Sequence, residues 1–450
     1  MGAPSDTSSV GRAAVGVGIL SLVLGAITLG TKALWYDEAF NAVRIDGSWR
    51  DLVHAVGATE MSQGVYMAGL KAWATVTPNS EAWLRFPSIV FAALAAALLV
   101  PLGTRLFDRR TGIIAGVLLA TNAFVIRHAQ EARTYALVTL AVVVASILFV
   151  KALDDPRRRN WLLYAVAAAA AVYCHFYAGF VVVAHLATIP FAPIRPPWRR
   201  VAEAGALFVV LISPVLYFTT RAGREQLLWI DDPSLEIVLR LFERNVGRNL
   251  ILGAFAALGL VLLAYRAGSG GAVNRWRFAL IGGWCVFPVA LGILVSLIQP
   301  ILVGRYAIVI APAIALAAAF PIALALSRHR PVGIVVLVAL LAVSGYRVTT
   351  WYRSVPEDWR SAVEYVSAQK RPGDDVVIAP FWSWRAFAYY DGEQPLGETA
   401  GKRRTFLVVY AWPRDRSELA DTRVEQDLLR VDAERQFGDR LVVRIYEPRQ

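Results

Sequence analysis

Long apolar runs separated by short polar segments occupy the first three quarters of the chain. Most have roughly the 17–25 residues that a helix needs to cross a bilayer. The two shortest runs are those at 112–127 and 161–174. The first run follows one arginine and shows no small-residue cleavage site, so we expect a retained helix and not a signal peptide. The pattern predicts a polytopic α-helical membrane protein with about 11 transmembrane helices, at residues 14–34, 83–104, 112–127, 134–152, 161–174, 176–194, 202–220, 249–266, 278–298, 306–326 and 331–347.

The pattern changes after residue 347. An amphipathic helix is predicted to begin in Glu357-Asp358-Trp359-Arg360 and to end near Gln369. Strand-like stretches then alternate with helical ones, which predicts a small α/β domain with a three-stranded, mostly parallel sheet. We therefore expect a transmembrane domain at 1–347 and an α/β domain at 348–450, with strands at 376–378, 406–410 and 441–445 and helices at 382–390 and 417–431.

The 348–450 segment contains no phosphate-binding glycine loop, which favours a scaffold or acceptor-binding role over a second catalytic centre. Aromatic residues of this segment allow two interpretations. They stack on sugar rings, or they form a core and membrane-facing patch, which is the more common arrangement. The residues are Trp382, Trp384, Tyr389 and Tyr390.

Basic residues gather in five of the short loops, and under the eleven-helix count all five fall on one side of the membrane. The positive-inside rule makes that side cytoplasmic. We therefore expect a multi-pass protein of the plasma (inner) membrane with a cytoplasmic N-terminus and an extracytoplasmic 348–450 domain. The formal net charge of +12 is then largely a signal of topology. The basic residues are separated by predicted membrane helices, which argues against nucleic-acid binding. The basic loops lie at 105–110, 155–159, 195–200, 266–277 and 328–330.

Composition and motifs exclude several classes of protein. Hydrophobic residues make up 57% of the chain and charged residues 18%, which rules out an ordinary soluble protein. The sequence contains no Walker motif, no glycine-rich dinucleotide fingerprint and no HExxH motif. Cys174 and Cys285 lie in apolar runs, where buried thiols act as small hydrophobic side chains. The predicted cytoplasmic loops are too short to form a domain that uses a nucleotide-sugar donor.

Polar residues accumulate in the segments predicted to face outward. The 35–82 segment contains apolar residues at helical spacing over 49–56 and 65–73, which predicts two short helices along the membrane surface. Arginine, histidine and tyrosine also cluster at helix ends, where such residues commonly act as interfacial anchors. That alternative is reasonable for each cluster alone, but their convergence on one membrane face favours a functional site. The clusters lie at 127–135, 175–177, 221–248 and 299–306.

Two adjacent carboxylates, Asp37 and Glu38, follow the first apolar run in the sequence Trp35-Tyr36-Asp37-Glu38-Ala39-Phe40. Charges near hydrocarbon are poorly solvated and therefore costly to hold there. Carboxylates held at such a position are therefore more often part of a functional site than incidental surface charges.

Four sequence elements together resemble the GT-C membrane glycosyltransferases that use polyprenyl-phosphate sugars. They are the acidic pair Asp37-Glu38, the string Gln130–Leu137, the element His175–Ala178, and Gly304-Arg305-Tyr306 before a late helix. Relatives include protein O-mannosyltransferases and the aminoarabinose transferase that acts on lipid A. Many relatives carry a Pro-Pro-Leu-Tyr-Tyr type string where this chain has Ser62–Met67. That departure bears on the acceptor more than on the reaction class.

The resemblance implies an inverting glycosyltransferase that moves a mannose- or arabinose-type sugar from a polyprenyl-phosphate donor to a cell-envelope glycolipid, polysaccharide or protein. It assigns the general base to Asp37, with Glu38 as a secondary or orienting acid. Some family members place a divalent cation beside the acid. The sequence leaves open whether Asp37 and Glu38 hold a metal ion. The leaving phosphate is then bound by Arg133 and Arg305, with Tyr306, His128 and His175 as further donors.

Two other classes compete with this interpretation. A transporter or lipid flippase also has many helices with buried charges. The apolar runs of this chain contain few ionisable residues, however, and show no two-fold hydropathy repeat. A membrane scaffold would explain the helices but not the acidic pair or the arginines.

Overall fold

The computed structural model describes residues 7–59, 63–221, 230–397, 403–410 and 431–447. It forms two compact units, each built from separated stretches of chain. The first unit comprises Met1–Ile27, Arg50–Leu70 and Arg85–Tyr352. The second comprises Thr28–Trp49, Lys71–Leu84 and Arg353–Gln450.

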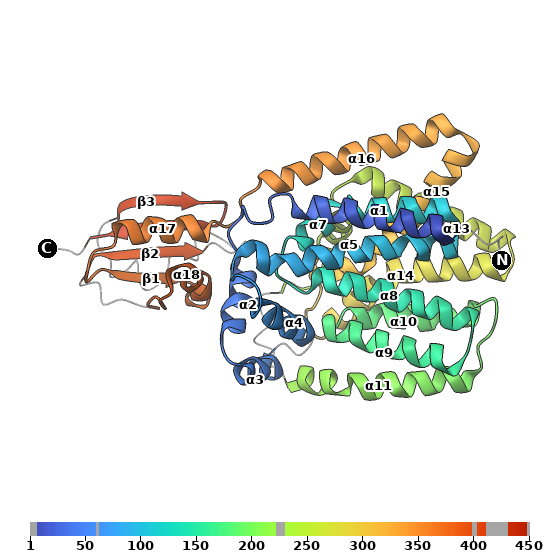
Figure 1. Ribbon diagram of the computed structural model, residues 1–450, viewed down its shortest axis with the longest axis horizontal. Helices are drawn as coiled ribbons and strands as arrows, with labels where there is room; N and C mark the ends of the chain where they lie inside the picture. The colour runs from blue at the N-terminus through green and yellow to red at the C-terminus, as the bar shows by residue number, and fades with distance from the viewer. Residues whose placement is uncertain (1–6, 60–62, 222–229, 398–402, 411–430, 448–450) are drawn as a thin grey trace. The chain divides into compact units, whose positions relative to one another are not determined.

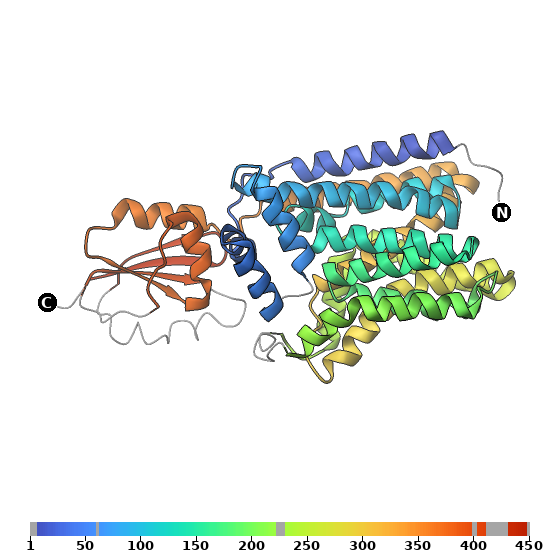
Figure 2. The same ribbon diagram turned by 60° about the horizontal axis from the view of Figure 1, so that its bottom comes forward.

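The first unit is a bundle of helices that run nearly parallel to one another in both views (Figure 1 and Figure 2). Every apolar run that predicted a transmembrane helix overlaps at least one helix of the structure, although the 14–34 run extends beyond α1 and the 112–127 run spans two helices. The helices that build the bundle are α1 (Thr7–Ala26), α5 (Glu81–Leu106), α6 (Arg109–Ala120), α7 (Ala123–Ala129), α8 (Tyr135–Asp154), α9 (Arg158–Cys174), α10 (Ala178–Thr188), α11 (Trp198–Arg221), α13 (Leu250–Ser269), α14 (Ala272–Ser296), α15 (Ala311–Arg328) and α16 (Arg330–Arg353). Short 3-10 turns at Ile189–Phe191 (η2) and Tyr306–Ile310 (η4) extend α10 and precede α15.

By length and composition, eight helices in the described part of the chain can cross a membrane, or nine if the bent pair α6–α7 is one span. The expected number was about 11. The difference comes from α9, which has 17 residues, and from the apolar stretch Ala178–Phe191, both of which are short for a full crossing. The chain bends by 59° between α6 and α7, where Asn122 accepts hydrogen bonds from the amides of Phe124 and Val125 and so begins a new helix.

Burial differs sharply among the helices of the bundle. The span that contains α15 is 94% buried and forms its centre, whereas no more than 22% of α1, α11, α13 or α16 is buried. Exposed apolar faces are expected of helices that contact lipid. Close packing around α15 depends on small residues, since a Cβ at Gly259 of α13 would collide with the carbonyl group of Ala317.

Alternating helix directions bring several linking segments to one end of the bundle. Thr134, before α8, donates its hydroxyl to the carbonyl of Cys174 at 2.6 Å. The Tyr177 hydroxyl donates to the carbonyl of Ile301 at 3.3 Å. Segments predicted to face outward from three different places in the sequence therefore lie together.

The second unit contains a four-stranded sheet in the order β1-β2-β4-β3. Its strands are β1 (Asp375–Ala379), β2 (Thr405–Tyr410), β3 (Val431–Phe437) and β4 (Leu441–Tyr446). Strand β1 pairs with β2 in parallel, with Val377 opposite Leu407, and the other two pairings are antiparallel. The expected three-stranded, mostly parallel sheet is therefore wrong.

The additional strand β3 explains the error. It joins β4 through a tight turn in which Gly438 has a φ of +70°. Its sequence, VDAERQF, is mostly polar because it forms the edge of the sheet, so it lacks the apolar run that marks a buried strand. The helix expected at 417–431 lies almost entirely outside the described residues.

The second unit also contains helices from the C-terminal segment and one from the N-terminal part of the chain. The expected amphipathic helix is α17 (Trp359–Gln369), and the expected 382–390 helix is a 3-10 turn at Phe381–Ser383 (η5) followed by α18 (Trp384–Asp391). Helix α18 packs against α2 (Tyr36–Asp46), which the sequence pattern did not predict. The two short helices expected in the 35–82 segment are α3 (Trp49–Thr59) and α4 (Gly64–Ala74).

Candidate functional site

Asp37 and Glu38 lie in the first turn of α2, in the second unit. The Glu38 carboxylate accepts the backbone N–H of Trp35, the N-cap residue, at 3.3 Å. Glu38 is buried and closes the first turn of the helix, as the acid of a capping box does. Asp37 is half-buried and is the more accessible carboxylate of the pair. The positive end of the helix dipole favours its negative charge.

Glu357 holds the start of α2 in place, and sequence reasoning assigned it no functional role. Its Oε2 accepts the backbone N–H of Tyr36 at 3.0 Å and the indole N–H of Trp359 at 3.1 Å. Its Oε1 accepts the hydroxyl of Tyr410 at 2.8 Å and lies 3.2 Å from Arg440 Nη1. Burial raises the pKa of the Glu357 carboxyl even though these donors favour the ionised form.

Aromatic rings enclose the same turn of α2. The Tyr36 ring lies 4.8 Å from Trp382 and 6.1 Å from Tyr410, centre to centre. Burial and the charge of Glu357 raise the pKa of Tyr410, and the charge of Asp37 adds to the effect. Trp382 therefore packs against the first turn of α2.

We expect Glu357→Gln to loosen the first turn of α2. The glutamine side chain would place its own N–H donors opposite the N–H and O–H donors that the Glu357 carboxylate now accepts. An unsatisfied buried polar group costs about 1–3 kcal/mol. Hydrogen exchange of the backbone amides at 35–38, measured on the full chain in nanodiscs, should accelerate, and the thermal unfolding temperature should fall.

Glu364→Gln is the matched control, because Glu364 is exposed on α17 of the same unit. Unchanged exchange at 35–38 in Glu357→Gln would show that the buried carboxylate does not support α2.

Lys71 holds the other end of α2. Its buried ammonium group donates to the carbonyl of Ile45 at 2.7 Å and to that of Gly47. These carbonyls are among those that a helix leaves unpaired at its C-terminal end, where a positive charge is also favourable. Both ends of the helix that carries Asp37 are therefore fixed by buried charged side chains.

A buried ion pair in the first unit links the end of α7 to the segment before α8. His128 Nδ1 lies 2.7 Å from Glu131 Oε2, and Arg127 Nε lies 3.5 Å from Glu131 Oε1. Burial opposes ionisation of Glu131, but the contact with His128 and the charges of Arg127 and Arg305 outweigh it and lower the pKa of Glu131 to about 2. Glu131 is therefore ionised at neutral pH.

His175 forms a second centre immediately after α9. Its Nδ1 accepts the backbone N–H of Tyr177 at 3.2 Å, which places the ring proton on Nε2. Burial lowers the pKa of His175 to about 3, with a further contribution from the charges of Arg133 and Arg305. The Tyr306 ring lies 4.7 Å from the His175 ring. A neutral His175 can therefore donate one hydrogen bond from Nε2.

Tyr135 connects the two centres, since its ring lies 4.8 Å from His128 and 6.0 Å from His175. The Arg133 guanidinium lies 5.7 Å from the centre of the same ring. The structure thus brings together, at one end of the bundle, five of the site residues expected from the sequence: His128, Arg133, His175, Arg305 and Tyr306. Asp37 and Glu38 belong to the second unit.

Arg244 is an additional basic residue of this cluster. It lies on α12 (Leu235–Asn245), and a Cβ at Gly304 would lie only 3.3 Å from its Cδ and Nη1 atoms. Burial lowers the pKa of Arg244, and neighbouring arginines, Arg127 and Arg305 among them, contribute. The 221–248 segment was expected to face outward, but its sequence did not distinguish Arg244 from its neighbours.

Four arginines therefore lie near the Glu131 and His175 centres, and the charges of Arg127 and Arg305 act on the Glu131 carboxylate itself. This arginine cluster consists of Arg127, Arg133, Arg244 and Arg305. Guanidinium groups bind anions with several oxygen atoms through paired hydrogen bonds, and partial burial strengthens such contacts. The cluster is suited to hold a phosphate group.

Metal binding was left open from the sequence. Among the residues that the structure describes, no group of three or more His, Cys, Asp or Glu side chains is arranged to hold a metal ion. Glu38 already accepts the Trp35 amide, so one of the two acids considered as ligands has a structural role.

Comparison with solved structures identifies the fold. ArnT from Cupriavidus metallidurans, solved with undecaprenyl phosphate, is similar over 98% of this chain and 98% of its own, with a TM-score of 0.59 and 14% sequence identity. The chain has the GT-C fold. The expected resemblance to the GT-C membrane glycosyltransferases is thereby confirmed at the level of the fold.

Further matches agree with the GT-C fold. The archaeal oligosaccharyltransferase AglB from Archaeoglobus fulgidus, solved with an inhibitory peptide and a dolichol-phosphate, covers 88% of this chain and 69% of AglB, with a TM-score of 0.54 and 10% identity. Residues 66–218 match the family dolichyl-phosphate-mannose-protein mannosyltransferase. That stretch includes His128, Arg133 and His175 and ends before Arg305. No curated protein matches the chain by sequence.

Proposed function

We propose that this GT-C protein is an inverting glycosyltransferase that moves a sugar from a polyprenyl-phosphate donor to a cell-envelope acceptor. The observation that carries the proposal is the arginine cluster at one end of a membrane bundle. A lipid phosphate carries its charge at the membrane surface while its tail stays in hydrocarbon. The name of the matching family favours mannose, and the ArnT similarity is compatible with an arabinose-type sugar.

The proposed reaction is a direct displacement at the anomeric carbon. The acceptor hydroxyl attacks this carbon as Asp37 takes its proton, and the bond to the phosphate oxygen breaks. The electron pair leaves with the lipid phosphate, whose added negative charge is stabilised by Arg133 and Arg305. Attack from the side opposite the leaving group inverts the anomeric configuration.

His175, Tyr306 and His128 complete the proposed donor site. His175 offers the Nε2 proton and stays neutral because of its burial. Glu131 keeps His128 and Arg127 oriented by direct contact. We assign Glu38 to the support of α2, since its carboxylate is engaged in the first turn.

We further propose that the protein lies in the plasma (inner) membrane with its N-terminus in the cytoplasm. The five basic loops support this orientation through the positive-inside rule. An odd number of crossings, eleven as expected from the sequence or nine when α6–α7 counts as one span, then places the second unit and the acceptor outside the cytoplasm. A reporter fused after Gln450 that is active in the cytoplasm would contradict this orientation.

Transfer is tested with purified protein in nanodiscs and radiolabelled polyprenyl-phosphate mannose or arabinose. Membrane extract supplies glycolipid, polysaccharide and protein acceptors, and ATP is omitted. Label that moves to an acceptor supports the proposal. Donor lipid that crosses the bilayer with its sugar intact, without transfer, supports the alternative of a transporter or lipid flippase.

A further inference from the structure

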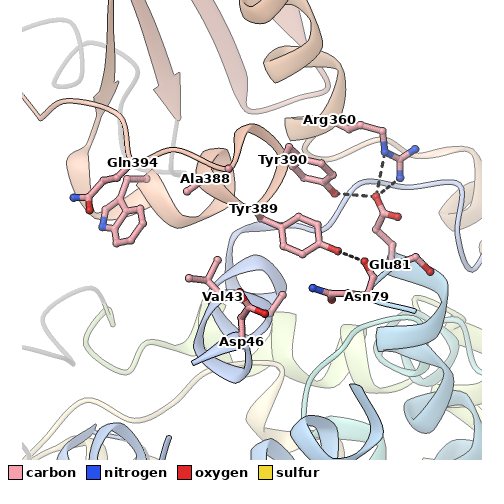
Figure 3. A pocket seen from close by; sticks show the side chains of 13 residues that line it. Val43, Asp46, Asn79, Glu81, Arg360, Ala388, Tyr389, Tyr390 and Gln394 are labelled. Carbon is pink, nitrogen blue, oxygen red and sulfur yellow. Dashed lines mark hydrogen bonds and ion pairs between the residues drawn. The ribbon is translucent and has the colours of Figure 1, made fainter. Parts of the chain in front are cut away.

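A pocket of about 690 Å³ lies within the second unit and has no part in the proposed displacement reaction (Figure 3). This volume falls within the range of about 300–1,000 Å³ that is typical of small-molecule sites. The pocket lies between α18 and the C-terminal half of α2, where Ala42, Val43 and Asp46 contribute to its wall. These positions lie on the face of α2 opposite to Asp37, because they are five, six and nine residues further along a helix with 3.6 residues per turn.

Half-buried aromatic rings form one part of this pocket. Trp384, Tyr389 and Tyr390 line it, and the two tyrosine rings pack edge to face at 4.8 Å. In the view of Figure 3, these tyrosines lie between Gln394 on one side and Arg360 and Glu81 on the other. Flat aromatic faces stack well on the apolar C–H face of a sugar ring.

Hydrogen bonds keep the tyrosines and the charged wall in place. The Tyr389 hydroxyl donates to the carbonyl of Asn79 at 3.3 Å, and that of Tyr390 donates to Glu81 at 3.1 Å. Arg360 Nε lies 3.1 Å from the same Glu81 carboxylate oxygen. These contacts order the pocket before any ligand binds, which lowers the entropic cost of binding.

The remaining polar side chains of the wall suit hydroxyl groups. Asp46, Asn79 and Gln394 line the pocket, and their side chains make no hydrogen bond to another residue in the described part of the chain. A carboxylate and two amides together accept and donate hydrogen bonds, which matches the mixed donor and acceptor character of sugar hydroxyls.

Charge narrows the choice of ligand. Asp46, Glu81 and Arg360 are the charged residues of the described pocket wall, and the last two form an ion pair. Asp46 therefore leaves the wall with a negative charge, which disfavours a phosphate or another acid. The number of polar groups likewise disfavours a lipid chain.

We propose that this pocket binds a neutral saccharide, the glycan part of the acceptor, apart from the transfer reaction. The inference rests on the proposed function for the source of the saccharide. Binding itself requires neither donor nor turnover.

The experiment uses the full chain in nanodiscs, without donor, and the neutral disaccharides mannobiose and arabinobiose as probes. Saturation-transfer NMR should detect binding of at least one of them. Trp384→Ala should weaken that binding about tenfold, in the range of a central contact residue, and Trp384→Phe should restore much of it. Asp46→Ala and Gln394→Ala alter exposed side chains, so they test the pocket even if Trp384→Ala fails to fold.

Trp198→Ala is the control, since Trp198 is an exposed tryptophan at the start of α11 in the first unit. Absence of binding, binding unchanged in both Asp46→Ala and Gln394→Ala, or tighter binding of mannose 6-phosphate would overturn the proposal. Saccharide binding without sugar transfer would contradict only the proposed transferase function. Sugar transfer without saccharide binding would contradict only the proposed role of this pocket.

Discussion

Asp37→Asn should leave the protein folded and lower the rate of sugar transfer by about 10²–10⁴, the usual contribution of a general base. The amide has nearly the same shape, and the contacts that hold α2 are made by Glu38, Glu357 and Lys71. The loss should therefore appear in kcat, with the donor KM and the thermal unfolding temperature close to those of the wild type.

One companion variant, Glu38→Gln, locates the general base. Glu38→Gln should mainly reduce stability, because its carboxylate caps the helix. Near-normal turnover in Asp37→Asn together with inactivity of a stable Glu38→Gln would move the base by one residue. Normal turnover in both variants would remove the acidic pair from the reaction.

Arg305→Lys and Arg133→Lys should retain the fold and impair transfer. A guanidinium binds a phosphate through two parallel hydrogen bonds, whereas an ammonium offers a single point of charge. The loss of one hydrogen bond to a charged group costs about 1.5–3 kcal/mol, or about 10–100-fold in kcat/KM. Arg305→Ala should be impaired more strongly. The measurement is the rate of sugar transfer at a series of donor concentrations for each variant.

Interfacial anchoring makes a different prediction for the same variants. Lysine anchors a helix end as well as arginine does, so a pure anchor would tolerate the change. Arg157→Lys, in the predicted cytoplasmic loop before α9, is the matched control. Wild-type turnover and donor affinity in both Arg305→Lys and Arg133→Lys would show that these arginines only position helices.

Much of the bundle could be predicted from apolar periodicity, because each helix buries or exposes its own apolar surface. The short helices α3 and α4 were found for the same reason, from apolar residues at helical spacing. Helix α2 was missed because its N-cap is Trp35, which lacks the short polar side chain that usually marks a helix start. Strand β3 was missed because an edge strand needs no apolar run.

The candidate site of the first unit was partly predictable. Three of the four elements of the family resemblance contain Arg133, His175, Arg305 and Tyr306, and His128 lies in the polar cluster at 127–135. Arg244 and Glu357 were not predictable, because their roles depend on contacts between distant parts of the chain. Glu357 binds the Tyr36 amide across 321 positions in the sequence. No local pattern distinguishes such an acid from an ordinary helix-start residue.

The second unit is assembled from stretches near both ends of the chain, and this has a consequence for biosynthesis. Helix α2 is among the first segments to leave the ribosome, but Glu357, Tyr390 and Tyr410, which contact it or the residues just before it, are translated near the end. The nascent protein can therefore insert its bundle long before the turn that carries Asp37 is held in place. A chain that is truncated before residue 357 would keep the arginine cluster and lack an ordered acid. Under the proposed function, premature termination should therefore yield an inert membrane protein and not a poorly controlled transferase.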